Sequence, residues 1–486
     1  MIKNIDIFEK EPIPKAVMKL AVPTVLSMIV AVLYNMVDAF FVGKTNDPSM
    51  FAAVNVATPV FMFLMAAGNI FGMGGSSFLS RALGQKNFEK VSNISSFCFY
   101  GSLVVGVVGG AAILAFMEPI LGAIGTTVGT AGFAREYLSI IAMGGPLIVV
   151  STAFTNIIRG EGASKNSMIG MMVGTAVNII LDPIFILDEI FGIKLLGMGV
   201  KGAAIATLIG NAVSLAMFIG HILSKNSVLT LNIKKFKIGG GILSGVLVIG
   251  LPASLTNILM SVSSIATNKL LASYYGVEVV SESLIPLVTT FIEGKPVYGD
   301  IPVSAMGAAL KANMLAIFVQ LGLGMGIAPL IGYNYGARNF KRMKGVMKFS
   351  IAANVVAGVV LTALYCIFAK QIIQIFSNVD IVLHIGRNMI YGLMTSVPFI
   401  GIMFCLNFTF QAIGKGVQSL TLAVSRQGFV FFPMLLIMNH FFGIYGIVYA
   451  QPIADIISVF IALFMFLKLN KDFKEIEAEM EALQLI

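Results

Sequence analysis

Long apolar runs separated by short polar segments recur along the whole chain of 486 residues. Each run is at least about 20 residues long, the length that a helix needs to cross the hydrocarbon core of a bilayer. Strands of a membrane β-barrel would instead be about ten residues long with alternating hydrophobicity. The pattern predicts twelve membrane-spanning helices, at 16–43, 50–78, 92–116, 133–157, 166–187, 200–223, 243–272, 303–331, 345–368, 385–410, 416–438 and 443–467.

The composition places the chain among polytopic all-α membrane proteins. Hydrophobic residues make up 57% of it and charged residues only 11%, whereas soluble domains carry roughly 25% charged residues. A water-soluble enzyme and a disordered chain are therefore excluded. The cysteines, Cys98, Cys366 and Cys405, lie in apolar runs without CxxC spacing, so neither a disulfide framework nor a zinc site is expected.

The net charge of +9 follows from membrane topology. Most of the Lys and Arg residues lie in segments that are cytoplasmic if the N-terminus is inside, for example Lys86, Lys234 and Arg338. Positive-inside bias therefore predicts a multi-pass protein of the cell membrane with both termini in the cytoplasm. Topology accounts for the basic residues, so no nucleic-acid partner is expected.

The two halves of the chain repeat each other. Residues 72–88 (GMGGSSFLSRALGQKNF) align with residues 324–340 (GMGIAPLIGYNYGARNF) at an offset of 252, and further along Gly199 aligns with Gly443. Each half holds six spans, an even number, so both copies have the same orientation in the membrane. Transporters are often built from such repeats, with the substrate handled between two bundles.

The repeat sets the predicted domains and isolates one insertion. An N-terminal six-helix lobe (1–224), a cytoplasmic linker (225–242), a C-terminal six-helix lobe (243–468) and a short helical cytoplasmic tail (469–486) are expected. The second copy carries an additional segment at 278–300, on the outer side. An ornamental loop, a re-entrant piece and an outer lid all fit this segment.

Carboxylates inside the predicted spans are the main functional candidates, because ionisable groups at membrane depth are costly. Asn35 and Asp38 are three residues apart in span one, and Asn178 and Asp182 are four apart in span five, so each pair shares a helix face. These groups can exchange a proton or hold Na⁺ through oxygen ligands. Tying helices together is the structural alternative for either Asp.

A second polar pair is predicted in the C-terminal half. Arg426 lies near the middle of span eleven and needs an acidic or carbonyl partner, for which Asp455 of span twelve is the candidate. A structural ion pair and a contact with substrate both remain open. DAFFVGKT (38–45) imitates the end of a P-loop without its first glycine, so direct ATP drive is not expected.

Several motifs together carry a resemblance to a known family. They are PTVLSMIVAVLYNMVDAFFVG in span one, LSRALGQKN after span two, NIILDPIFIL in span five, GVKGAAIAT opening span six and IGYNYGARN after span eight. With these segments the chain resembles the multidrug and toxic compound extrusion (MATE) transporters, in particular their MepA-like bacterial branch. The resemblance implies two pseudo-symmetric six-helix bundles forming a V about a central cleft.

The resemblance also implies a function and a site. It implies a multidrug efflux antiporter that exports lipophilic organic cations in exchange for H⁺ or Na⁺ by alternating access. The cation-coupling cluster would fall on Asp38, Asn178 and Asp182, with Tyr137 and Thr207 as neighbours. The hinge of span one would fall on Pro23.

The expected partners are small organic cations and the lipid bilayer, and a monomer is expected. No cofactor is expected besides the coupling ion, H⁺ or Na⁺, and Na⁺ at Asp38 and Asp182 is the one metal ion considered. No catalytic residues are expected. A lipid-linked precursor flippase of the same superfamily is the first alternative, and an ion channel is the second.

Overall fold

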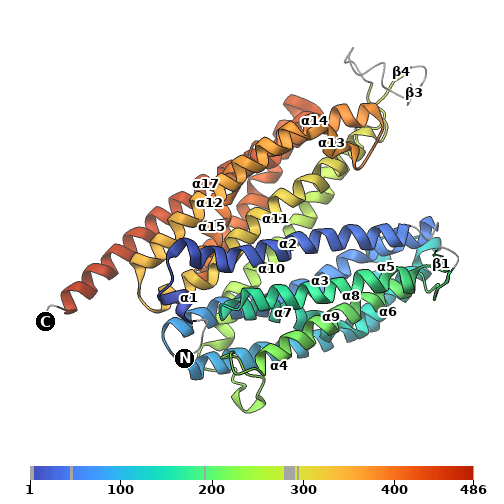
Figure 1. Ribbon diagram of the computed structural model, residues 1–486. Helices are drawn as coiled ribbons and strands as arrows, with labels where there is room; N and C mark the ends of the chain where they lie inside the picture. The colour runs from blue at the N-terminus through green and yellow to red at the C-terminus, as the bar shows by residue number, and fades with distance from the viewer. Residues whose placement is uncertain (1–4, 44–46, 191–192, 279–290, 293–294, 485–486) are drawn as a thin grey trace. The chain divides into compact units, whose positions relative to one another are not determined.

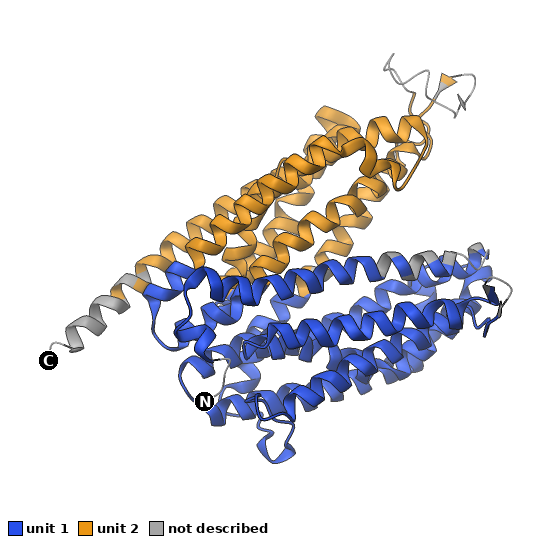
Figure 2. Ribbon diagram, in the orientation of Figure 1, with its two compact units in different colours: residues 1–254, 326–346, 411–416 blue, residues 255–325, 347–410, 417–486 orange. Residues whose placement is uncertain are grey.

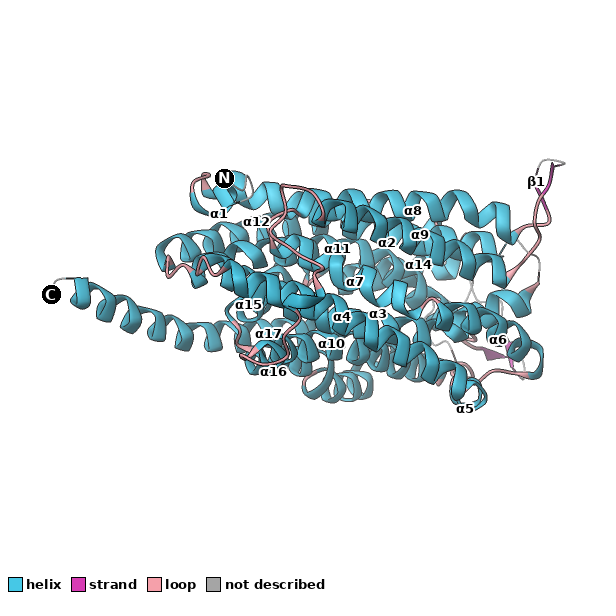
Figure 3. Cartoon of the chain, turned by 90° about the horizontal axis from the view of Figure 1, so that it is seen from below, coloured by secondary structure: helices cyan, strands magenta, loops and turns pink. Residues whose placement is uncertain are grey.

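In the computed structural model the described residues are 5–43, 47–190, 193–278, 291–292 and 295–484, and for a few of them, including Asn35 and Asp38, the side chains are not described. Helices form nearly all of this part of the chain (Figure 1, Figure 3). Two short antiparallel hairpins join helices, β1 (Glu189–Ile190) with β2 (Ile193–Lys194) and β3 (Phe291–Ile292) with β4 (Lys295–Pro296). The rest of the insertion, residues 279–290 and 293–294, lies outside the described residues.

The first half contains nine helices among the described residues. They are α1 (Ile5–Glu9), α2 (Ile13–Gly43), α3 (Pro48–Gly84), α4 (Phe88–Ala115), α5 (Met117–Ala123), α6 (Val128–Met143), α7 (Gly145–Gly160), α8 (Ser164–Ile186) and α9 (Val200–Ile222). Side chains cap several of their starts, because the first backbone N–H groups of a helix lack partners within it. Asp47 accepts a hydrogen bond from the Ser49 amide at 2.8 Å, and Asn87 accepts one from the Lys90 amide at 2.9 Å.

The second half repeats this order. After the 3₁₀ turn η1 (Ile233–Lys235) come α10 (Ile242–Ala272), α11 (Ile301–Gly336), α12 (Phe340–Ile367), α13 (Ala369–Gln374), α14 (Asp380–Met394), α15 (Val397–Ile413), α16 (Gly416–Val424), the π-helix η3 (Ser425–Phe429) and α17 (Phe431–Gln484). The starts of α12, α13, α14, α15 and α16 follow those of α4, α5, α6, α7 and α8 by the offset of 252 that the sequence predicted.

Backbone conformation confirms the repeat at single residues. Lys86 and Arg338, which the offset pairs, both have positive φ, 57° and 55°. Gly199 and Gly443 have φ of 53° and 57° with ψ of −127° and −136°. A residue with a Cβ rarely adopts such a conformation, so glycine is needed at both places to redirect the chain into the next helix.

The predicted twelve spans are accounted for. Nine helices among the described residues are long and apolar enough to cross a membrane, and two bent pairs, α6 with α7 and α14 with α15, add one span each. The run Gly416–Lys471 has 56 residues, about 84 Å if straight, which is far more than a bilayer core needs. Gly443 divides this run into the two predicted spans.

Two of the predicted spans consist of two helices joined at a bend. The span at 133–157 bends by 60° between α6 and α7, and the span at 385–410 bends by 46° between α14 and α15. Pro146 and Pro398 lie just after these bends. Proline cannot donate to the preceding turn and clashes with it, which explains a break at both equivalent places.

The described chain forms two compact units (Figure 2). Unit 1 contains Met1–Ser254, Gly326–Val346 and Gln411–Gly416, and unit 2 contains Leu255–Met325, Met347–Phe410 and Val417–Ile486. The units are defined by contacts between residues, and unit 1 includes two segments from the second half of the repeat. The lobe, linker and tail boundaries expected from the sequence therefore stay a prediction.

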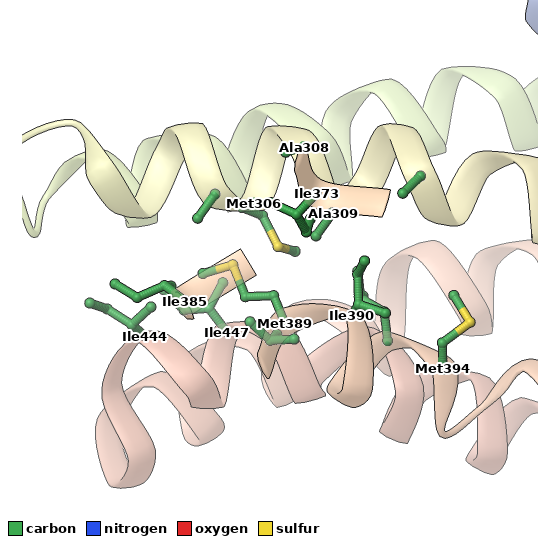
Figure 4. Close-up of a cluster of buried hydrophobic side chains, with 14 of the residues drawn as sticks. Met306, Ala308, Ala309, Ile373, Ile385, Met389, Ile390, Met394, Ile444 and Ile447 are labelled. Atoms are coloured by element: carbon green, nitrogen blue, oxygen red, sulfur yellow. The ribbon is translucent and has the colours of Figure 1, made fainter. Parts of the chain in front are cut away.

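Each unit has an apolar core. In unit 1 it includes Leu138, Ile141 and Val149. In unit 2, side chains of α11, α14 and α17 meet, among them Met306, Met389 and Ile447 (Figure 4). The tail after the last span continues α17 as far as Gln484 rather than starting a separate helix.

The linker is bound along α4 in unit 1. Ser95 and Tyr100 donate hydrogen bonds to the backbone oxygens of Thr230 and Leu231, at 2.9 and 2.8 Å. Just before this stretch, the buried Glu161 carboxylate accepts hydrogen bonds from the Ser227 hydroxyl and the Val228 amide. It also pairs with the imidazole of His221. The linker backbone is thus held at several points rather than being left in solvent.

Candidate functional site

The predicted pair of polar residues in span five lies on α8. Asn178 and Asp182 are 2% and 0% exposed, and Asn178 Nδ2 donates a hydrogen bond to Asp182 Oδ1 at 3.2 Å. Residues four apart lie one above the other on a helix, which is why the two side chains meet. The shared face predicted for this pair is confirmed. A fully buried carboxylate therefore lies within an apolar span.

Close packing of α8 on α9 brings Thr207 toward the same region. A Cβ added to Gly174 of α8 would lie 2.4 Å from the backbone oxygen of Gly210, and one added to Gly210 would lie 3.0 Å from Cβ of Asn178. Only glycine allows this approach. Thr207 lies one turn before Gly210 on α9, and its hydroxyl is hydrogen-bonded to that of Tyr34 on α2 at 3.2 Å. The helices α2, α8 and α9 therefore meet around these polar groups.

The structure gives the places of two of the remaining predicted residues, Tyr137 and Pro23, but not of the side chains of Asn35 and Asp38. Tyr137 is buried in α6, 6% exposed, among apolar side chains of unit 1. Pro23 lies inside α2, ten residues after its start at Ile13. Asn35 and Asp38 also belong to α2, but their side chains lie outside the described residues. Their part in the site stays a prediction.

Tyr34 is a site residue that the sequence analysis missed. It precedes Asp38 by four residues, so both belong to one helix face, and this spacing was a usable signal. Its hydroxyl links α2 to α9 through Thr207. A tyrosine in an apolar span is usually interpreted as a packing residue because of its ring. Its hydroxyl, which needs a hydrogen-bond partner when buried, is then overlooked.

The predicted partnership of Arg426 and Asp455 is confirmed within unit 2. Arg426 Nε donates to Asp455 Oδ1 at 2.7 Å, and the two side chains are 7% and 2% exposed. Gln451 and Ser396 donate to the same carboxylate at 2.8 and 3.0 Å. The sequence analysis missed both donors, although Gln451 precedes Asp455 by one helical turn. The guanidinium also lies over the ring of Phe404, with Cζ 5.2 Å from its centroid.

The oxygen atoms at Asn178 and Asp182 suit a hard cation. Amide and carboxylate oxygens are the ligands that such cations prefer, and Asn178 Oδ1 accepts no hydrogen bond from the described residues. Among those residues, no three side chains of His, Cys, Asp or Glu gather as a metal site. A cavity of about 520 Å³ lies elsewhere, between the start of α4 and the linker, and its lining includes Lys90 and Lys237.

Comparison with known proteins adds a family and a set of relatives. A family model described as MatE matches residues 23–184 and 275–437, one stretch in each half. The multidrug export protein MepA of Staphylococcus saprophyticus subsp. saprophyticus is 32% identical over 456 residues, 94% of this chain and 94% of that protein. MepA of Staphylococcus haemolyticus is 30% identical over 463 residues, 95% of each chain.

Solved structures agree on the fold. One described as "Crystal structure of MATE in the straight conformation" has a TM-score of 0.84 at 25% identity, covering 97% of this chain and 99% of that one. A second, "Crystal structure of MATE in the bent conformation", has a TM-score of 0.83 at 25% identity, covering 98% and 99%. The likeness extends over essentially the whole of each chain.

Proposed function

The chain belongs to the MatE family, and from this premise we propose that it exports drugs and other lipophilic organic cations in exchange for H⁺ or Na⁺. The family is one of transporters rather than enzymes. The relatives named multidrug export proteins support the substrate class, because the match covers nearly the full length of both chains. The many apolar helices support a location in the cell membrane.

The observation that supports coupling to a cation is the burial of Asp182. Its side chain is 0% exposed in an apolar span, where an ionised carboxylate is costly. A proton or a Na⁺ that neutralises this charge removes the free-energy cost of burying the carboxylate between the helices. Binding of the cation therefore biases the protein between arrangements that treat this group differently.

Exchange follows if drug and cation favour opposite arrangements. In the proposed cycle the cation binds at Asp182, Asn178 and Asp38 while the substrate path is open to the outside, and drug is released. When the path opens inward, the cation leaves and drug binds. Reciprocal coupling of two ligands requires only that each prefers a different state. No ATP is consumed in this cycle.

Pro23 is the proposed hinge of α2. A proline inside a helix lacks the N–H that would bond to the preceding turn, so the helix bends more easily there. The hydroxyl of Ser27 donates to the backbone oxygen of Pro23 at 2.9 Å, next to this weak point. A bend here would move the half of α2 that carries Tyr34 and Asp38 relative to α8 and α9.

The proposed topology places both termini in the cytoplasm, and the proposed working unit is a monomer. Positive-inside bias carries the first of these proposals. In this orientation the linker bound to α4 lies on the cytoplasmic side, together with the starts of α2, α4 and α12.

Ethidium uptake into everted vesicles tests the function. Wild-type vesicles should accumulate ethidium when acid inside or loaded with Na⁺, and the effective gradient identifies the coupling ion. Asp182→Asn and Asp38→Asn should lower uptake to that of vesicles lacking the protein. An amide carries no negative charge, so neither variant can take up H⁺ or Na⁺ at that position as a carboxylate does. Asp188→Asn, which changes an exposed carboxylate after the same helix, is the matched control and should retain uptake.

Wild-type uptake in Asp182→Asn would contradict the proposed role of this carboxylate. Cation flux through the wild-type protein without any movement of ethidium would instead support the ion-channel alternative. Membrane insertion of each variant is checked by its abundance in the vesicle fraction.

A further inference from the structure

We propose that the cavity between the start of α4 and the linker binds a phosphate ester, supplied as the headgroup of an anionic phospholipid. The cavity lies wholly within unit 1 and has a volume of about 520 Å³. Its lining comes from the first two turns of α4 and from residues 237–242, where the linker ends and α10 begins. This binding is separate from the proposed export cycle, so it can be tested without measuring transport.

Contacts between the linker and α4 hold the walls of this cavity in place. The ring of Phe97 on α4 stacks on that of Phe236 in the linker, with centroids 6.0 Å apart. One residue further along the linker, Lys237 Nζ lies 3.3 Å from Oε1 of Glu89, in the first turn of α4. A ligand that enters this space therefore meets groups that are already oriented, which lowers the entropic cost of binding.

Positive groups outnumber negative groups in the lining. Lys90 and Lys237 contribute ammonium groups, and Glu89 contributes a carboxylate. Glu89 is paired with Lys237, whereas Nζ of Lys90 lies 4.6 Å from the centroid of the Phe78 ring and forms no ion pair within the described part of the chain. The first backbone N–H groups of α4 add the partial positive charge of a helix N-terminus. The cavity therefore favours an anion.

A buried side-chain amide in the lining has an unused donor. Asn93 is 6% exposed and lines the cavity. Its Nδ2 donates no hydrogen bond to the described residues and, unlike its Oδ1, is not sealed from its surroundings. Buried polar groups normally have partners, so this donor indicates a ligand with an acceptor. Lys90 precedes Asn93 by three residues and shares its helix face, which allows a phosphate group to accept from both side chains.

The linker presents bare backbone to the same space. Gly240 and Gly241 have positive φ, 67° and 76°, which explains glycine at these two positions. Gly239 has no positive φ, and a Cβ added to it would meet no atom within 4 Å, so neither conformation nor packing requires glycine there. The amides of Gly239 and Gly240 donate no hydrogen bond within the described residues. Successive N–H groups in such turns bind anions, and glycine lets a ligand approach them closely.

The position of the cavity favours a lipid as the source of the phosphate. Helix α4 has 28 residues, about 42 Å of helix, whereas the hydrocarbon core of a bilayer is about 30 Å thick. Residues 87–93 are mostly polar, so this end of the helix extends to the depth of the headgroups. Next to the polar lining, the apolar side chains of Phe88, Ile238 and Leu243 are 44%, 54% and 40% exposed, a surface suited to acyl chains. In the proposed topology the lipid belongs to the inner leaflet.

Tryptophan fluorescence tests this binding, because the chain contains no tryptophan of its own. Phe88→Trp introduces one beside the cavity without changing a residue of the lining. The full-length protein with this substitution is placed in phosphatidylcholine discs that contain increasing fractions of brominated phosphatidylglycerol or brominated phosphatidylcholine. Bromine on the acyl chains quenches nearby tryptophan, so the two titrations give the relative affinities of the two lipids. Soluble glycerol 3-phosphate, added at millimolar concentration, is the competitor that distinguishes a free phosphate ester from a lipid.

Phosphatidylglycerol should bind roughly five- to twenty-five-fold more tightly than phosphatidylcholine, since each lysine near an anionic lipid contributes about a factor of five. Gly239→Asp adds a carboxylate to the cavity, where nothing obstructs its Cβ, and should abolish this preference. Lys234→Gln is the matched control, because it lowers the net charge of the linker equally but lies outside the lining. It should change the preference by no more than about twofold, since salt screens exposed charges. Asn93→Ala leaves the charge unchanged and should weaken phosphatidylglycerol binding about two- to tenfold, the worth of one hydrogen bond.

Equal quenching by the two brominated lipids in the protein with an unchanged lining would overturn the inference. An equal loss of preference in Gly239→Asp and Lys234→Gln would also overturn it, because the general charge of the linker would then be the cause. Displacement of phosphatidylglycerol by glycerol 3-phosphate would overturn the lipid as the source of the phosphate, and no displacement supports it. The thermal unfolding midpoint of each variant shows that a loss of binding is not a loss of folding.

Discussion

The N-terminal segment of unit 1 (residues 5–11) should detach when Phe8 is truncated. Phe8 is fully buried and stacks on the ring of Tyr333, with centroids 4.7 Å apart and planes at 11°. Arg342 Nε donates to the backbone oxygen of Phe8 at 2.7 Å, and Arg342 Nη2 donates to that of Glu11 at 2.6 Å. The hydroxyl of Tyr333 donates to Glu9 at 2.7 Å. The buried ring of Phe8, together with these hydrogen bonds, anchors a five-residue helix that could not be stable alone.

Truncating a buried phenylalanine to alanine costs roughly 3–5 kcal/mol. Since about 1.4 kcal/mol corresponds to a factor of ten, Phe8→Ala should raise the detached population more than a hundredfold. Tyr333→Phe keeps the stacking and removes one hydrogen bond to Glu9, whose side chain is 33% exposed. That loss is worth roughly 0.5–1.5 kcal/mol, so a two- to tenfold rise is expected.

Hydrogen exchange of the purified protein in lipid discs measures this population directly. The amides of Lys10 and Glu11, which both bond to the backbone oxygen of Asp6, report detachment of the segment. Phe88→Ala, at a phenylalanine that is 44% exposed, is the control and should leave their exchange unchanged. Equal exchange in wild type and Phe8→Ala would refute the anchoring role. Equal effects of Phe8→Ala and Tyr333→Phe would refute the assignment of most of the energy to apolar stacking.

Two further substitutions in unit 1 test the packing of α8 on α9 and the attachment of the linker. Gly174→Val should lower the thermal unfolding midpoint, because its Cβ would lie 2.4 Å from the backbone oxygen of Gly210 and α8 must move away from α9. Such overpacking costs roughly 1–3 kcal/mol. Gly122→Val, where nothing lies within 4 Å, should leave the midpoint unchanged, and the same shift in both variants would count against the packing argument. Glu161→Gln should speed tryptic cleavage of the linker, because charge-assisted bonds to Ser227 and its neighbours weaken by roughly 1.5–3 kcal/mol. Wild-type cleavage rates there would show that the linker is held by its other contacts.

The membrane spans and the repeat were determined by the sequence alone. Whether a stretch of about 20 residues crosses a bilayer depends on its own apolar content, so hydropathy is sufficient to find it. Conformation at Gly199 and Gly443 is likewise local, since only glycine tolerates it, and this is why the aligned motif predicts equivalent turns. The face shared by Asn178 and Asp182 follows from helix periodicity.

Partners from distant segments were decided by the tertiary structure. Periodicity tells which residues share a face, but it does not tell which helix that face meets. The contact of Tyr34 with Thr207 depends on how closely α8 and α9 pack through their glycines, and hence on the route of α2 beside them. Ser396 reaches Asp455 because the chain breaks between α14 and α15, a bend that hydropathy does not record. Apolar content is a property of a segment, whereas a site in this protein is a property of several segments packed together.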